Sequence, residues 1–310
     1  MLSKKRVMVF GATGYIGRQV VQELVKRQYQ VVAVSRRKVN AEEFAGAELR
    51  ITDATSRESL KDVFRDEINV VISCLANHDP GKPEDFYKID YQATLNILQA
   101  AQENVTDHFI LLSAICVRRP KLALQRAKLE MEHALMISGM DYTIVRPTAY
   151  FRDLSGQFAN ILKGSPAYML GSGEYAHYNP IAKEDLAAYL ANCIEDVGHR
   201  NRINIIGGPE VPENIVTYKR ILEMSYQAIG REPKIKSLPR WVLSAVMGMT
   251  AFIGLFIPKV RFAAGIIRLM NYYLTTDLRA PGYGTITMKD HLEMMAAESE
   301  APRAQRGASR

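Results

Sequence analysis

The chain has 310 residues and a formal net charge of +7. This length can bury the core of one large α/β domain or of two smaller ones. The apolar fraction of 47% and the charged fraction of 24% are ordinary for a soluble globular protein. The positive charge suits an anionic ligand or an anionic membrane surface. A nucleic-acid partner is excluded, because the chain has no dense Lys/Arg stripe with interleaved aromatic residues.

The cysteines and the N-terminus indicate the compartment. Cys74, Cys116 and Cys193 lie in apolar stretches without the spacing of a metal site, so we expect buried thiols in a reducing compartment and no metal. The basic start MLSKKR is followed by only a short apolar run, VMVF, which is too short for a secretory signal. A cytoplasmic protein is therefore expected.

The first half of the chain alternates between two patterns. Continuous apolar runs rich in β-branched residues predict strands, and apolar residues at helical spacing predict helices between them. The predicted strands are 6–10, 31–35, 69–74, 109–113 and 142–146, and the predicted helices are 15–27, 57–66, 90–103 and 123–138. This alternation predicts an α/β fold, a doubly wound parallel sheet of the Rossmann type.

The pattern loosens after Pro147. Residues 150–180 are rich in Gly and Tyr and are expected to form loops over a pocket. A helix at 183–194, a strand at 202–207 and helices at 215–229, 239–256 and 260–274 are predicted to follow. We therefore expect an NADP-binding domain over 1–150, a smaller and mostly helical substrate lobe over 151–296, intertwined with the sheet, and a disordered tail over 297–310.

Residues 241–257 form an uncharged run of 17 residues between Arg240 and Pro258-Lys259. A helix that crosses a membrane needs about 20 apolar residues. Three interpretations remain open: a buried helix, a helix that lies on a membrane surface, and a membrane span. Trp241 beside Arg240 suits an interfacial anchor, but a buried helix end would have the same sequence. Peripheral membrane contact through 241–257 is therefore one expectation.

A glycine-rich loop follows the first predicted strand in VMVFGATGYIGRQVV, residues 7–21. Gly11 permits the tight turn, Gly14 lets a pyrophosphate approach the backbone, and Gly17 lets helix and strand pack closely. The loop ends at a helix N-terminus, whose free N–H groups attract phosphate. The strand–loop–helix context predicts a dinucleotide site. The expected contacts of the loop with the cofactor are Gly11, Thr13, Gly14, Tyr15, Ile16 and Gly17.

Later strand ends indicate which dinucleotide binds. Arg36 and Arg37 stand where an acidic residue would bind the ribose 2′-hydroxyl of NAD, and an arginine there pairs with a 2′-phosphate. NADPH is therefore the predicted cofactor. Asp53 accepts a hydrogen bond from the adenine amino group or caps a helix, and the sequence favours neither. At the end of the fourth strand, the cofactor contacts are expected at Cys74, Leu75 and Ala76.

Several longer stretches are distinctive, including GATGYIGRQVV, VVISCLAN, KIDYQATLNILQAA, HFILLSAICVRRP, LQRAKLEMEHAL and YTIVRPTAYFRDLSGQ. With IAKEDLAAYLANCI, INIIGGPE and MNYYLTTD, they cover roughly 5–277. The sequence resembles the divinyl chlorophyllide a 8-vinyl-reductases, an atypical, NmrA-like branch of the short-chain dehydrogenases. The resemblance implies NADPH-dependent reduction of the 8-vinyl group of divinyl (proto)chlorophyllide to ethyl in chlorophyll or bacteriochlorophyll synthesis. After NYYLTTD the segment LRAPGYGTITMKDH is shorter than in these reductases, which puts the substrate in doubt.

The usual catalytic pair of short-chain dehydrogenases is incomplete here. Lys128 occupies the lysine position of the Tyr-x-x-x-Lys motif, but Leu124 replaces the tyrosine. We expect Lys128 and Ser113 to contact the cofactor, Lys128 through the nicotinamide ribose; a solvated helix lysine is the alternative. Vinyl reduction is compatible with the missing phenol, because charge spreads into the conjugated ring rather than onto one carbonyl oxygen.

The substrate contacts are predicted from polar aromatic positions beyond the sheet. Tyr150 and Phe151 follow the sixth strand, where open α/β sheets place ligands, and could stack on a flat ring. Packing in the core is their alternative. His177 and Tyr178 are candidates for lining the pocket. Tyr150 and His177 are candidate proton donors and, with Lys128, the candidate catalytic residues. A solvated histidine is the alternative for His177. The expected substrate is a hydrophobic small molecule, most simply a tetrapyrrole.

Two other functions fit the same residues. One is a related reductase that acts on another hydrophobic substrate, such as a quinone-like or isoprenoid-like molecule. The other is a non-catalytic NADP(H)-binding protein that serves as a sensor or assembly factor.

Overall fold

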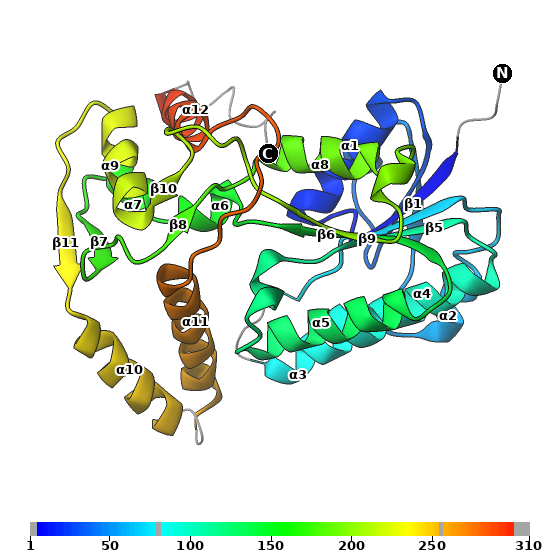
Figure 1. Cartoon of the computed structure of the whole chain (residues 1–310), viewed down its shortest axis with the longest axis horizontal. Coiled ribbons are helices and arrows are strands. Elements are labelled where there is room, and N and C mark those ends of the chain that lie inside the picture. The colour runs from blue at the N-terminus through cyan, green and yellow to red at the C-terminus, as the bar shows by residue number, and fades with distance from the viewer. Residues whose placement is uncertain (1–4, 78–81, 254–256, 301–310) are drawn as a thin grey trace. The chain divides into compact units, whose positions relative to one another are not determined.

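The computed structural model describes residues 5–77, 82–253 and 257–300 (Figure 1). The chain divides into two compact units, Met1–Pro147 with Lys183–Ile206, and Thr148–Ala182 with Gly207–Arg310. The first boundary lies close to the one expected at residue 150. The segment Lys183–Ile206, however, returns to the first unit, although the expected substrate lobe included it, because its last strand pairs with the sheet.

The first unit is built on a seven-stranded sheet in the order β3-β2-β1-β4-β5-β6-β9, in which every neighbouring pair is parallel. Its strands are β1 (Arg6–Phe10), β2 (Gln30–Ser35), β3 (Ala47–Ile51), β4 (Val70–Ser73), β5 (His108–Leu112), β6 (Asp141–Pro147) and β9 (Arg202–Ile206). The strand order reverses between β1 and β4. The predicted doubly wound fold is confirmed, and ligands of such sheets bind beyond the carboxyl ends of the strands at this reversal.

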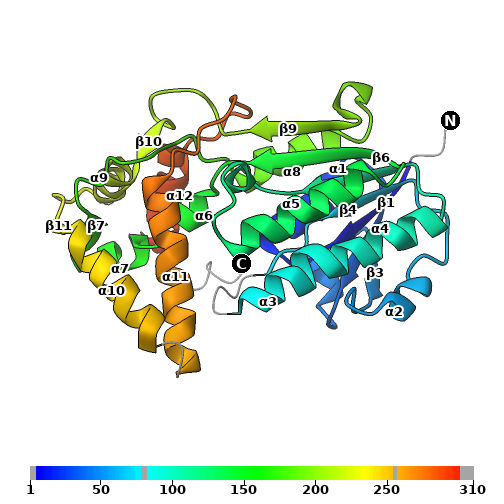
Figure 2. The ribbon, with the colours of Figure 1, turned by 60° about the horizontal axis from the view of Figure 1, so that its bottom comes forward.

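Helices cover both faces of this sheet (Figure 2), which explains why the central strands read as continuous apolar runs. α1 (Tyr15–Lys26) and α8 (Lys183–Asn192) pack together, and α4 (Thr94–Glu103) packs against α2 (Arg57–Lys61) and α5 (Ala123–Met136). The core between sheet and helices includes side chains that are fully or almost fully buried, among them Phe10, Ile97, Leu98, Phe109 and Ile144.

A π-helix interrupts the predicted helix at 90–103. The chain forms α3 (Pro83–Phe86), then a wide turn over Tyr87–Ala93 labelled η2, and only then α4. A wider turn departs from the 3.6-residue period of an α-helix, so the spacing of apolar residues does not reveal it. π-turns inside helices are frequent at functional sites, and this one holds Asp90 with only 3% of its surface exposed.

The second unit contains two small sheets and several helices. β7 (Ala167–Leu170) pairs with β11 (Ile235–Leu238) in parallel, and β8 (His177–Tyr178) pairs with β10 (Val216–Thr217) in antiparallel. The helices of this unit include α6 (Phe151–Leu154), α7 (Phe158–Leu162), α9 (Tyr218–Ala228) and α12 (Met288–Glu300). The region 150–180, expected to be loops, therefore contains short elements.

The helices predicted at 239–256 and 260–274 are α10 (Arg240–Ile253) and α11 (Pro258–Thr275), which pack against each other as a hairpin. Residues 254–256 of the predicted apolar helix lie outside the described residues. None of the described side chains of α10 is buried, so the interpretation as a buried helix is wrong. Over the part of the chain that is described, no helix has the length and apolar character needed to cross a membrane.

The expected disordered tail begins later than predicted. α12 continues to Glu300, so 297–300 are helical. The remaining residues of that tail, 301–310, lie outside the described part of the chain.

Candidate functional site

The glycine-rich loop connects β1 to α1, and two positions in this segment accommodate only glycine. Gly11 has a φ of +72°, and a Cβ there would lie 2.8 Å from the carbonyl oxygen of Cys74. A Cβ on Gly17 would lie 2.1 Å from the carbonyl oxygen of Gly11. The close approaches of the loop to β4 and of α1 to the loop therefore explain both residues, as the sequence predicts.

The N-terminus of α1 is arranged to receive an anion. Gly14 is the N-cap and provides no side-chain cap, and the first turn has no acidic residue. The N–H groups at the start of a helix and the positive end of the helix dipole suit a phosphate. Thr13 is exposed beside this turn, whereas the Ile16 side chain is buried in the core. The ring of Tyr15 lies 5.7 Å from the Lys183 ammonium.

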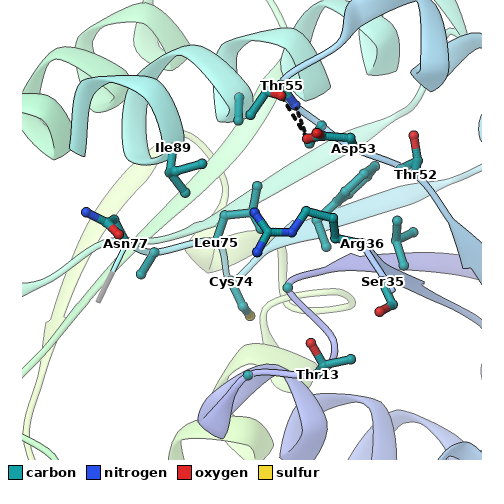
Figure 3. A pocket seen from close by; sticks show the side chains of 17 residues that line it. Thr13, Ser35, Arg36, Thr52, Asp53, Thr55, Cys74, Leu75, Asn77 and Ile89 are labelled. Atoms are coloured by element: carbon teal, nitrogen blue, oxygen red, sulfur yellow. Dashed lines mark hydrogen bonds between the residues drawn. The ribbon is translucent and has the colours of Figure 1, made fainter. Parts of the chain in front are cut away.

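A cavity of about 340 Å³ opens beside this loop, at the carboxyl ends of the first strands (Figure 3). Of the predicted cofactor residues, those that line it are Gly11, Thr13, Gly14, Arg36, Asp53, Cys74, Leu75 and Ala76. The predicted residues outside its lining are Tyr15, Ile16, Gly17, Arg37, Ser113 and Lys128. The sequence did not predict several other lining residues, among them Ser35, Thr52, Thr55, Asn77 and Ile89.

The two arginines after β2 differ in position. Arg36 extends into the cavity (Figure 3) and forms no hydrogen bond or ion pair with another residue that the structure describes. Arg37 does not line the cavity; its main chain binds Ser35, whose hydroxyl donates to the Arg37 carbonyl oxygen at 2.7 Å. Only Arg36 is therefore placed to meet a phosphate group in this cavity.

Asp53 lines the cavity across from Arg36 (Figure 3). Its Oδ1 accepts hydrogen bonds from the backbone N–H and the hydroxyl of Thr55, at 3.0 and 2.8 Å. These bonds lower the pKa of the Asp53 carboxyl. Ser56, not Asp53, caps α2, because its hydroxyl accepts from the Ser59 N–H. The helix-cap interpretation of Asp53 is therefore wrong, and the carboxylate remains a candidate acceptor for adenine.

Lys128 on α5 is held by a buried carboxylate at the edge of the cavity. Its ammonium lies 2.9 Å from Oδ1 of Asp90, and the two side chains are 11% and 0% exposed. The other oxygen of Asp90 accepts from the backbone N–H of Asn77 at 3.0 Å. The interpretation of Lys128 as a solvated lysine is therefore wrong. Because Asn77 and Ile89 line the cavity, the ion pair borders it without lining it.

The sequence analysis missed Asp90 as part of this site. A signal was present, since Asp90 is the acidic residue of the distinctive stretch KIDYQATLN, among apolar residues at helical spacing. Its pairing with Lys128 joins residues 38 positions apart in sequence, which local pattern analysis cannot detect.

Ser113 follows β5 and belongs to a second buried network. Its hydroxyl donates to a carboxylate oxygen of Glu132, which lies one turn after Lys128 on α5. The same carboxylate accepts two bonds from Nε of Arg146, at 3.1 and 3.2 Å, and forms an ion pair with its Nη2. The Glu132 side chain is fully buried. Ser113 is therefore engaged within the protein, and Arg146 supports this network.

Leu124 lies one turn before Lys128 on α5, where the sequence lacks the tyrosine. The side chain at this position is a hydrocarbon that neither donates nor accepts a proton. A carbonyl-reducing site of the usual kind is therefore absent at Lys128.

None of the three cysteines forms a disulfide in the described structure. Cys116 and Cys193 are buried as predicted, whereas Cys74 is half-buried and lines the cavity. Burial raises the pKa of the Cys74 thiol to about 12, although the positive charge of Lys128 opposes the shift. Cys74 therefore contributes a neutral, weakly polar wall to the cavity.

Two of the predicted substrate contacts are core residues of the second unit. Phe151 is 2% exposed and stacks on His291, with 5.1 Å between ring centroids. Tyr178 is fully buried, its hydroxyl donates to the carbonyl oxygen of Tyr273, and burial raises its pKa. Packing, which was the alternative for the aromatic pair at 150–151, describes Phe151, and Tyr178 is also structural.

Tyr150 and His177 are more accessible. Tyr150 precedes α6 and is half-buried, and its backbone bridges to Ile181. His177 is exposed in β8, and its backbone N–H donates to a carboxylate oxygen of Asp277 at 3.1 Å. Both belong to the second unit, whereas Lys128 belongs to the first. Their roles as proton donors therefore stay predictions.

The cavity fits a phosphorylated dinucleotide in its chemistry. The glycines of the loop carry no side chains beside the N-terminus of α1, Arg36 supplies a cation, and Asp53 supplies an acceptor. Gly11, Gly14 and Thr13 would hold the pyrophosphate, and Leu75 and Ala76 continue the wall beyond β4.

Comparisons with known proteins agree with this site. Residues 11–197 match the model of a family described as NAD(P)H-binding. The chain is 35% identical to divinyl chlorophyllide a 8-vinyl-reductase of Arabidopsis thaliana, over 95% of this chain and 78% of that protein. It is 24% identical to the photosystem II assembly factor Ycf39 of Trieres chinensis, over 79% and 76% of the two chains.

A solved structure shares the fold. The NADPH complex of the quinone oxidoreductase QOR2 from Escherichia coli superposes with a TM-score of 0.71 at 18% identity, covering 93% of this chain and 99% of that one. The family match confirms the predicted nicotinamide cofactor, and the identity to the Arabidopsis enzyme confirms the resemblance found in the sequence. The chain belongs to the family of divinyl chlorophyllide a 8-vinyl-reductases, oxidoreductases with an NAD(P)H-binding Rossmann domain.

Proposed function

We propose that this protein reduces the 8-vinyl group of divinyl chlorophyllide or its protochlorophyllide counterpart to an ethyl group, with NADPH as the reductant. The observation that carries the proposal is the identity of 35% to a reductase of that name across 95% of the chain. The site agrees in one informative respect: Leu124 leaves no phenol beside Lys128, and vinyl reduction creates no carbonyl oxygen that needs such a donor.

NADPH is preferred over NADH in this proposal because of Arg36. Its guanidinium reaches into the cavity without a protein partner that the structure describes, and a guanidinium binds a phosphate through two parallel hydrogen bonds. NADH has no 2′-phosphate and would leave Arg36 unpaired. Asp53 opposite would accept from the adenine amino group, which both cofactors carry.

The chemistry needs a hydride on one vinyl carbon and a proton on the other. Bound NADPH supplies the hydride. The protein orients the nicotinamide end of the site: Asp90 fixes the Lys128 ammonium at the cavity edge, and Glu132 fixes Ser113 at the end of β5. The positive charge of the Lys128 ammonium would stabilise negative charge that develops nearby in the transition state. Tyr150 and His177 are the proposed proton donors.

Turnover of divinyl chlorophyllide by the purified full chain tests the proposal. The product is separated by reverse-phase chromatography and identified by a mass that is larger by two hydrogen atoms. We expect conversion that requires NADPH, proceeds poorly with NADH, and is slowed by Arg36→Ala at low NADPH but not at saturating NADPH. A folded protein that binds NADPH and leaves divinyl chlorophyllide unchanged would contradict the proposal.

A non-catalytic role is the second candidate. It is favoured by the likeness to the assembly factor Ycf39, which extends over 79% of the chain, and by the absence of a tyrosine beside Lys128. Such a protein would bind NADPH through the same cavity and turn over no substrate. A reductase of another hydrophobic molecule, such as a quinone, would instead oxidise NADPH with that molecule and spare divinyl chlorophyllide. The same turnover assay, run in parallel with a quinone in place of divinyl chlorophyllide and with NADPH oxidation as the readout, therefore separates the three functions.

A further inference from the structure

The hairpin of α10 and α11 carries an unusual surface for a globular protein. A helix at the surface of such a protein normally buries one apolar stripe and presents polar side chains outward. α10 has no charged residue after Arg240, and all of its exposed residues after Arg240 except Ser244 are apolar or glycine. Trp241 and Phe252 are 72% and 68% exposed.

These side chains form a stripe along one side of α10. The exposed residues Trp241, Ala245, Met249 and Phe252 are spaced by four, four and three positions, which places them on one face. The other face packs against α11. α11 itself exposes Phe262 and Met270. Figures 1 and 2 show the hairpin extending beyond β7, β11 and α9 of its own unit.

The positive charge around the hairpin indicates an anionic partner. Between Glu232 and Asp277, residues 233–276 contain six lysines and arginines and no aspartate or glutamate. They carry +6 of the formal net charge of +7, so the remainder of the chain is almost neutral. On α11, Arg261 and Arg268 are exposed at a spacing of seven, which places both on one side of the helix. An apolar stripe beside concentrated positive charge is the composition of a helix that lies in an anionic lipid surface.

We propose that the α10–α11 hairpin docks the protein onto an anionic membrane surface, with the α10 stripe among the lipid headgroups. α10 has 14 residues and is therefore about 21 Å long, whereas the hydrocarbon core is about 30 Å thick. The hairpin therefore lies along the surface and does not cross it. Trp241 is the aromatic anchor at the headgroup level. This inference goes beyond the proposed reaction and does not depend on it.

Flotation of the full chain with vesicles tests the docking. Vesicles of phosphatidylcholine alone are compared with vesicles that also contain phosphatidylglycerol, at low and high NaCl. We expect flotation with the anionic vesicles only, reversed by salt, because exposed charges are screened. The bound protein is expected to be released by carbonate. Protein that stays with the vesicles after carbonate treatment would contradict attachment along the surface. Protein that floats with neither kind of vesicle, or equally with both, would contradict the proposal.

Variants locate the binding surface. A basic residue near an anionic membrane contributes about 1 kcal/mol, so neutralising two predicts a loss of about thirtyfold in vesicle affinity. The variant is Arg261→Gln/Arg268→Gln, and the matched control is Lys26→Gln/Lys61→Gln, which removes the same charge from exposed positions of the first unit. Trp241→Ser/Phe252→Ser is expected to weaken binding as well.

The controls keep the outcome interpretable. Thermal unfolding and NADPH titration of each variant verify the fold of the protein, and none of the described residues that line the cofactor cavity belongs to the hairpin. Equal losses in the variant and its matched control would overturn the proposal, because the whole-protein charge would then explain binding. A wild-type chain that turns over substrate but does not float with anionic vesicles would contradict only the docking proposal, whereas a wild-type chain that floats without turnover would contradict only the proposed reaction.

Discussion

Arg36→Ala is expected to remove the preference for NADPH, and Arg37→Ala is the matched control. Arg36 lines the cavity and forms no hydrogen bond or ion pair with another described residue, whereas Arg37 lies outside the cavity lining. A hydrogen-bonded interaction with a charged group contributes about 1.5–3 kcal/mol, which corresponds to about a tenfold to hundredfold change in affinity. We therefore expect Arg36→Ala to weaken NADPH binding by that factor and to change NADH binding less than about threefold.

Calorimetric titration of both cofactors into the wild type and the two variants measures this effect. Arg37→Ala is expected to keep the wild-type affinity for NADPH within about threefold, since its side chain makes no contact in the cavity. Equal wild-type affinities for NADPH and NADH would refute the assignment of the 2′-phosphate to Arg36. A loss confined to Arg37→Ala would refute the geometry of the cavity.

Three further predictions concern packing and buried charge. Gly17→Ala is expected to destabilise the fold by about 1–3 kcal/mol or more, because the new Cβ would lie 2.1 Å from a backbone oxygen; Gly156→Ala, where nothing lies within 4 Å, is its control in urea unfolding. Asp90→Ala is expected to lower the free energy of unfolding by about 3–5 kcal/mol, because it leaves the Lys128 ammonium buried without its carboxylate. A smaller loss of stability in Asp90→Ala/Lys128→Met would identify the unpaired charge as the cause, whereas an equal loss would exclude it. Burial lowers the pKa of His108 to about 4, so the unfolded chain binds its proton first and stability should fall by up to about 3 kcal/mol from pH 6.5 to pH 4. That component should disappear in His108→Gln and persist in a variant of the exposed His177; an unchanged pH profile in His108→Gln would contradict it.

The parts of the fold that local pattern determines could be predicted from the sequence. β1 reads RVMVF and β5 reads HFILL, and both are buried on two faces, so continuous apolar runs mark them without ambiguity. The glycine loop could be predicted as well, because its function depends on backbone geometry that only glycine permits at Gly11 and Gly17.

The remaining features depend on contacts between distant residues. β8 and β10 have two residues each, which is too few to show the alternation of apolar and polar residues that marks a strand. They form strands because they pair with each other. Phe151 and Tyr178 stand in segments that resemble exposed loops, yet tertiary packing buries both. Asp90 lies in a π-turn and pairs with Lys128 of another helix, and no helical pattern in the sequence reveals either feature.

The most direct test of the proposed reaction follows the hydrogen from cofactor to product. NADPH that carries deuterium at the transferred position of the nicotinamide is incubated with divinyl chlorophyllide and the full chain, and the product is analysed by mass spectrometry. We predict one deuterium in the new ethyl group, since the hydride and the proton reach different carbons. An ethyl product without deuterium, or no ethyl product from protein that binds NADPH, would contradict direct reduction of the vinyl group.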